Sequence, residues 1–176
     1  MRKLSQKSFT LIEILVYIGV LSIIILVLVS FVLWFLHSNT KAKVMREVLD
    51  NARRAMEIMT YEIKGAESIY TPTSIFDSHP GQLSLETSKY LPEGEETTYI
   101  DFYLCDTQLC LKKESQDAVV LTLDNVEVSN IVFTLIVSGE VSSIQIDLKI
   151  DYKNPADRPE YRASVNLTST ASLRSY

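Results

Sequence analysis

Residues 7–36 read KSFTLIEILVYIGVLSIIILVLVSFVLWFL, and this stretch decides how the whole chain is arranged. No charged residue occurs from Ile14 to Leu36. A helix of about 20 apolar residues is long enough to cross the hydrocarbon core of a bilayer. The stretch therefore predicts one membrane-spanning helix, with Trp34 and Phe35 at its outer aromatic interface.

The flank before this helix carries positive charge at Arg2, Lys3 and Lys7. Positive charge beside the first span holds that end of the chain in the cytoplasm. We therefore expect a single-pass protein of the cytoplasmic (inner) membrane. Its N-terminus would lie in the cytoplasm and its C-terminal domain outside.

Two ordinary explanations of the apolar run fit poorly. A cleaved secretory signal has an apolar core of roughly 7–15 residues followed by a small-residue cleavage site. Here the run is longer and continues into Leu36-His37-Ser38-Asn39. A plain signal anchor leaves Glu13 unexplained, because a carboxylate inside an apolar span costs about 2.5 to 3.5 kcal/mol on insertion scales. An acid in such a place predicts a functional residue with a partner.

The segment Lys7-Ser8-Phe9-Thr10-Leu11-Ile12-Glu13 resembles the class III signal of type IV pilins and type II secretion pseudopilins. The resemblance implies that a prepilin peptidase cuts between Ser8 and Phe9, and that Phe9 becomes the N-methylated terminus. It also implies that Glu13 pairs with the N-terminal amine of a neighbouring subunit, since a buried carboxylate and a buried ammonium are costly apart and tolerable together. This chain departs from the family at Ser8, where Gly is usual, and at Ser30, where many pilins have Pro.

After the membrane segment, apolar residues recur at steps of three and four, and neither Pro nor Gly occurs from residue 21 to residue 64. This period predicts one continuous helix from about Thr10 to about Ala66, whose second half packs one face on a sheet. That face consists of Val44, Val48, Ala52, Ala55, Met59, Ile63 and Ala66.

From residue 67 onward the sequence has the pattern of strands, most clearly where Ile144, Ile146, Leu148 and Ile150 alternate with polar residues. The predicted strands are 83–87, 98–105, 109–113, 119–123, 131–137, 142–152 and 161–168, with loops at 71–82 and 154–159. The predicted class is α+β: a long N-terminal helix, transmembrane in its first half, packed on an antiparallel β-sheet domain as in pilins.

We therefore expect four parts. These are a cytoplasmic leader peptide (1–8), the transmembrane and assembly half of the helix (9–36), its amphipathic half (37–66) and an extracytoplasmic β-sheet domain (67–176). Residues 60–63, 123–126, 131–133 and 170–174 also look like the J-type minor pseudopilins and related minor pilins.

The chain contains no G-x-S-x-G, Gly-rich phosphate loop or H-E-x-x-H, so we do not expect an enzyme. No His/Cys cluster has metal-ligand spacing, and Glu93-Gly94-Glu95-Glu96 lacks the spaced ligands of a calcium loop. Neither a metal nor a cofactor is therefore expected. The net charge of −5 argues against nucleic acid as a partner.

Cys105 and Cys110 are the two cysteines, and they flank a turn-like segment between two strand-like runs. In an extracytoplasmic domain a disulfide across that turn is reasonable. Two free thiols are the alternative in a host that oxidises poorly.

Three functions follow from these observations. The first is a minor pilin or pseudopilin, a structural subunit that initiates or caps a pilus-like or type II secretion filament. Its expected partners are the prepilin peptidase, other minor and major pilins or pseudopilins, the inner-membrane assembly platform and the lipid bilayer. The second is a membrane-tethered module that captures a ligand or DNA, for which Glu13 has no use. The third is an anchored enzyme, which the missing catalytic motifs disfavour.

Overall fold

The computed structural model describes residues 10–89, 91, 94–139, 141–154 and 156–174. The chain divides into two compact units, Met1–Thr40 and Lys41–Tyr176. The long helix α1, Leu11–Gly65, begins in the first unit and ends in the second. The predicted continuous helix is therefore confirmed, with each end one residue inside the predicted bound.

In the first unit, α1 is apolar around its whole circumference. None of its residues between 11 and 39 is buried against other parts of the protein. This helix is long and apolar enough to cross a membrane by length and composition. Two of its polar side chains bond back to their own helix: the Ser22 hydroxyl donates to the carbonyl oxygen of Ile18 at 2.8 Å, and the Thr40 hydroxyl donates to that of Leu36 at 3.1 Å. Polar groups satisfied within the helix need no water, which suits a span in lipid.

In the second unit, one stripe of α1 is buried. The seven residues predicted to form this stripe are all at most 3% exposed, which confirms the 3.6-residue period as a packing face. The buried face is wider than predicted, because Asn51, Met56 and Glu62 are also less than 9% exposed.

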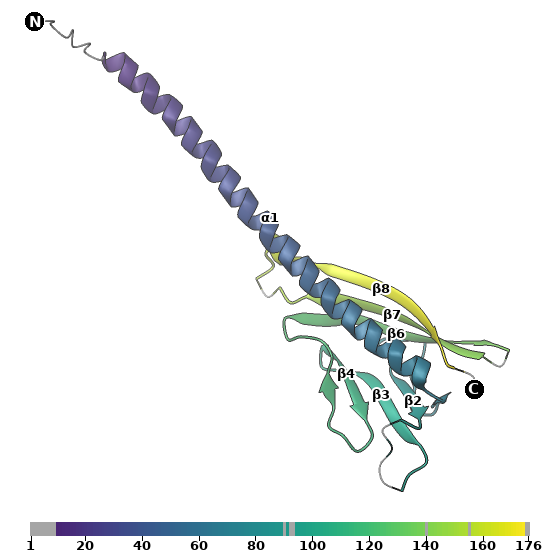
Figure 1. Cartoon of the computed structure of the whole chain (residues 1–176). Coiled ribbons are helices and arrows are strands. Elements are labelled where there is room, and N and C mark those ends of the chain that lie inside the picture. The colour runs from purple at the N-terminus through teal and green to yellow at the C-terminus, as the bar shows by residue number, and fades with distance from the viewer. Residues whose placement is uncertain (1–9, 90, 92–93, 140, 155, 175–176) are drawn as a thin grey trace, which may run out of the picture. The chain divides into compact units, whose positions relative to one another are not determined.

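Two antiparallel sheets form the rest of the second unit, as Figure 1 shows. The first sheet has the order β1-β2-β3-β4-β5, and its strands are Ser68–Ile69, Leu83–Thr87, Thr98–Cys105, Gln108–Lys113 and Val119–Val120. The second has the order β6-β7-β8, with strands Val126–Ser138, Val141–Tyr152 and Ser164–Ser172. The α+β class is confirmed, and the antiparallel β-sheet domain consists of two sheets, each a meander of sequence neighbours.

The predicted strand at 119–123 is shorter in the structure, because β5 ends at Val120. Leu121 and Thr122 still hydrogen-bond to Leu109 of β4, and the Leu123 N–H then donates to the Asn51 side chain of α1 rather than to a strand. β6 then begins at Val126, five residues before the predicted start. The predicted strand at 161–168 is shifted to Ser164–Ser172, because Pro159–Tyr161 forms a 3₁₀ turn. The short strand β1 was not predicted.

The hydrophobic core lies between α1 and the inner faces of both sheets. Its largest fully buried side chains include Met59, Phe102 and Phe133. The four isoleucine and leucine residues that alternate along β7 are all 0% exposed, as the period of two predicts. Every member of this core belongs to the second unit, whose apolar surface is thus buried by its own residues.

Candidate functional site

At the start of α1, Glu13 has hydrogen-bonding contacts with two nearby residues, Thr10 and Tyr17. The backbone N–H of Glu13 lies 3.1 Å from the carbonyl oxygen of Thr10 and 3.4 Å from its hydroxyl. The Tyr17 hydroxyl lies 3.5 Å from Glu13 Oε1, one turn along the helix. Thr followed three residues later by Glu is a capping-box pattern, and the helix dipole favours a carboxylate in the first turn. Sequence reasoning missed these contacts, although both spacings were visible.

These contacts do not neutralise Glu13. Thr10 and Tyr17 supply hydrogen-bonding groups, and residues 10–40 of the described chain contain neither Lys nor Arg. In an apolar environment the carboxylate therefore still lacks a positive charge, and an ionised group in such surroundings is costly unless it is paired. The arrangement can accept one cation, for which a compact ammonium group is well suited.

Ser8 and Phe9, the expected cleavage and methylation residues, lie outside the described residues. Their roles remain predictions from the sequence. The structure begins its description at Thr10, immediately after them.

A tight hairpin in the second unit brings the two cysteines together. β3 and β4 are joined by Asp106 and Thr107, and Asp106 has a φ of 54°, in the left-handed region that Asp tolerates better than most residues. Cys105 pairs with Gln108 and Cys110 with Tyr103, so the two cysteines are diagonal neighbours on one face of the hairpin. Their Cα atoms are 5.9 Å apart and a disulfide joins them in the structure. This Cα separation is ordinary for a disulfide.

We expect the exported protein to contain this disulfide. Removing it with Cys105→Ser and Cys110→Ser together should lower the free energy of unfolding by about 2 kcal/mol, because the closed loop is short and its chain-entropy contribution is correspondingly small. Non-reducing peptide mapping of protein from the native host measures the bond, and denaturant unfolding measures the loss. Recovery of both thiols free and alkylatable would contradict the prediction.

Polar contacts fix α1 against the segment that joins the two sheets. The side-chain oxygen of Asn51 accepts the N–H of Leu123 at 3.0 Å, while its amide donates to the carbonyl oxygen of Glu47 at 2.8 Å. The carboxylate of Glu47 accepts a hydrogen bond from the Asn125 amide. These bonds explain why Asn51 is buried on an otherwise apolar face, since buried polar groups require partners.

A second polar contact joins α1 to the first sheet. Glu62 is only 5% exposed, and its Oε1 lies 3.4 Å from Nζ of Lys113 on β4. Among the described residues, its Oε2 atom has no hydrogen-bond partner. Sequence reasoning treated residues 60–63 only as a family resemblance and missed this ion pair, whose partners are far apart in the chain.

No grouping suited to a metal appears in the described part of the chain, where no cluster of three or more His, Cys, Asp or Glu residues occurs. Of the acidic turn considered for calcium, Glu93 lies outside the described residues, and Glu95 and Glu96 are exposed. His79 has a structural contact, because its Nδ1 accepts the backbone N–H of Ile131 at 3.0 Å.

Comparison with known proteins adds one match, and it falls on the segment around Glu13. Residues 3–29 match the family model described as the prokaryotic N-terminal methylation motif. No curated protein and no solved structure matched the chain. The matched range contains Ser8, Phe9 and Glu13, whose roles in cleavage, methylation and pairing stay predictions from the resemblance. The match and the apolar helix that follows it indicate that this chain is a type IV pilin-like prepilin.

Proposed function

We propose that this chain is a minor pilin or pseudopilin, a structural subunit that initiates or caps a pilus-like or type II secretion filament. The observation that carries the proposal is Glu13, an unneutralised carboxylate at the start of an apolar helix and inside the matched motif. A membrane tether has no use for such a carboxylate. A filament subunit does, because pairing the carboxylate with a neighbour's amine would fix its position among the other subunits. The resemblance of residues 60–63, 123–126 and 170–174 to J-type minor pseudopilins supports the minor role.

The proposed route begins in the cytoplasmic membrane. The basic leader keeps residues 1–8 in the cytoplasm, where the prepilin peptidase cuts and the new terminus is methylated. The apolar half of α1 stays in lipid until the inner-membrane assembly platform transfers it among the helices of other pilins or pseudopilins. The two-sheet unit, from Lys41 onward, remains on the extracytoplasmic side throughout.

The first test of the proposal is the position of the cut. We expect a mature chain that begins with N-methylated Phe9, and no such product in cells that lack the peptidase. Ser8→Gly should be processed at least as fast as the parent, because Gly is the usual family residue there, whereas Ser8→Leu should block cleavage through bulk at a narrow protease site. Intact-mass analysis of the full chain measures both. A mature chain that starts at any residue other than Phe9 would contradict the assignment.

A further inference from the structure

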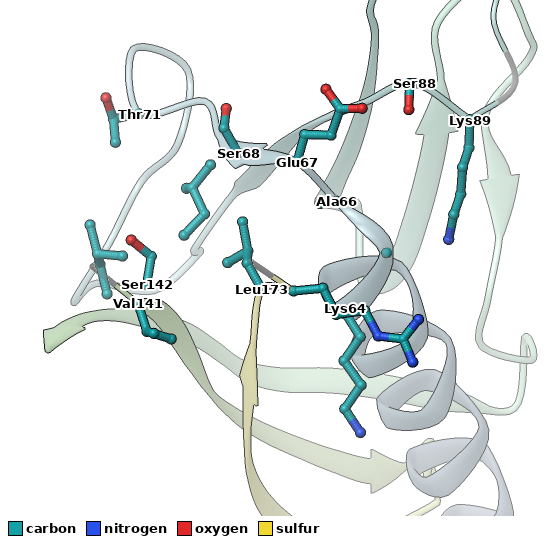
Figure 2. A pocket seen from close by; sticks show the side chains of 14 residues that line it. Lys64, Ala66, Glu67, Ser68, Thr71, Ser88, Lys89, Val141, Ser142 and Leu173 are labelled. Carbon is teal, nitrogen blue, oxygen red and sulfur yellow. The ribbon is translucent and has the colours of Figure 1, made fainter. Parts of the chain in front are cut away.

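A cleft with a volume of about 950 Å³ lies where α1 ends. Figure 2 shows Lys64 from the last turn of α1, Lys89 from the segment after β2, and Leu173 from the segment after β8 around it. Arg174 also lines the cleft, so three cations and the carboxylate of Glu67 surround it. In a chain of net charge −5, this is a local excess of positive charge that attracts carboxylates.

The cleft continues as a groove between α1 and β8. Next to it lies a hollow lined by Tyr61, Lys64 and Lys89 from one side and by Thr170, Ser172 and Leu173 from the other. Farther along, Tyr61 and Lys64 also line an apolar hollow with Met56 and Leu167. The shared residues make one groove that follows β8 from Leu167 to the basic end. The ammonium of Lys89 lies 5.0 Å from the ring centre of Tyr61, which holds this cation over the groove.

The strand beside this groove is an unprotected edge. β8 is the last strand in the order β6-β7-β8 among the described residues, so alternate backbone N–H and C=O groups along it point away from β7. Edge strands are usually protected by charged residues, Pro or short length. β8 has nine residues, SVNLTSTAS, with neither a charge nor a Pro. Such an edge is suited to pairing with another extended chain.

We propose that β8 and this groove accept an extended segment of another polypeptide as an added strand, with carboxylates of that segment at the end lined by Lys64, Lys89 and Arg174. Backbone pairing along β8 would provide affinity, and the cations would fix which end of the segment lies at the cleft. The proposal goes beyond filament assembly, because it needs neither leader cleavage nor Glu13.

The test uses the full-length chain in detergent micelles and fluorescent peptides with defined sequences. The probes are Thr-Val-Thr-Val-Thr-Val-Glu-Glu and the reversed Glu-Glu-Thr-Val-Thr-Val-Thr-Val, one for each strand direction. Control peptides replace the two Glu by Lys, or carry N-methyl groups on alternate backbone nitrogens. We expect one acidic peptide to bind measurably by fluorescence anisotropy. The Lys-containing and N-methylated controls should bind at least about tenfold more weakly, as the loss of two ion pairs or of the backbone bonds predicts.

Substitutions in the protein test the role of the cleft independently of the peptide controls. The double variant Lys64→Glu, Lys89→Glu should bind the acidic peptide about tenfold more weakly, or weaker still. The matched control, Arg54→Glu with Lys112→Glu, changes the net charge equally at exposed residues outside the groove and should leave affinity unchanged. Circular dichroism checks that both variants are folded. The peptide controls still decide the question if either variant is unfolded.

Three results would overturn the proposal. The first is no binding of either acidic peptide at concentrations up to about 1 mM. The second is equal binding of the N-methylated peptide, which would exclude strand addition. The third is equal loss of affinity in the control variant, which would show that net charge, and not the cleft, attracts the peptide.

Discussion

Glu13→Gln should abolish or strongly delay incorporation of this chain with partner pilins, while leaving membrane insertion and leader cleavage intact. Gln keeps the shape of the side chain, serves equally well at the N3 position of a capping box, and can still accept a hydrogen bond from the Tyr17 hydroxyl. What it removes is the negative charge. If the charge pairs with the amine of a neighbouring Phe9, the pairing is lost although the helix is unchanged.

The same pairing would fix the axial position of the subunit. Only one stagger of two neighbouring helices brings a single carboxylate beside a single ammonium, and a buried pair is better at specifying an arrangement than at adding stability. Glu13→Leu should therefore insert at least as well as the parent, because it removes the insertion cost, and should still fail to assemble.

The measurement is co-purification of tagged full-length variants with their partner pilins or pseudopilins. Tyr17→Phe is the matched control, because it removes the local hydrogen bond of Glu13 but keeps the charge, and it should assemble normally. Thermal unfolding in detergent should be the same for all three variants, since the core lies entirely in the second unit. Normal partner recovery with both Glu13 variants would favour the membrane-tethered binding module instead.

Lys113→Met should destabilise the second unit by about 3 kcal/mol, the typical cost of removing one partner from a buried ion pair. Glu62 would then be a carboxylate at 5% exposure without its lysine. Glu62→Leu should cost less, because Lys113 is 21% exposed and its ammonium can reach water. The double variant should lie within about 1 kcal/mol of the parent, since an apolar replacement of both partners removes the desolvation cost as well.

Denaturant unfolding of the full-length chain in a mild detergent, followed by circular dichroism, measures all four states of this cycle. Lys112→Met is the control: it is the exposed neighbour on β4 and should change stability by less than about 0.5 kcal/mol. Equal effects of Lys112→Met and Lys113→Met on the free energy of unfolding would show that burial of Glu62 does not require the ion pair with Lys113.

The sequence predicted those features that local periodicity determines. The stripe from Val44 to Ala66 follows the 3.6-residue period, the buried face of β7 follows the period of two, and the apolar run before them has the length of a bilayer. The roles assigned to Ser8, Phe9 and Glu13 also come from the order of a few neighbouring residues, and they stay predictions.

Long-range contacts account for what the sequence did not predict. Asn51 lies at the edge of the apolar stripe by the helical period, and only its bond with Leu123, 72 residues later, explains why a polar residue is buried there. The same bond lies in the segment between the two sheets, where the N–H of Leu123 is bound by the helix and not by a strand. Glu62 presents a similar case, because its partner lies on β4. In the first turn of α1, by contrast, the contacts with Thr10 and Tyr17 could have been predicted from their spacing.

The bonds of Asn51 and Glu47 also bear on how mechanical load passes through the second unit. The hydrophobic effect has no preferred direction and depends mainly on the apolar area that is buried. Hydrogen bonds are directional and break within about an ångström of misalignment. A pull along the axis of α1 would therefore act in shear on the contacts with Leu123 and Asn125 before it disturbed the apolar stripe. A slip of α1 by one helical turn is about 5.4 Å and would break both hydrogen bonds. The side chains of Asn51 and Glu47 therefore resist sliding of the helix under tension.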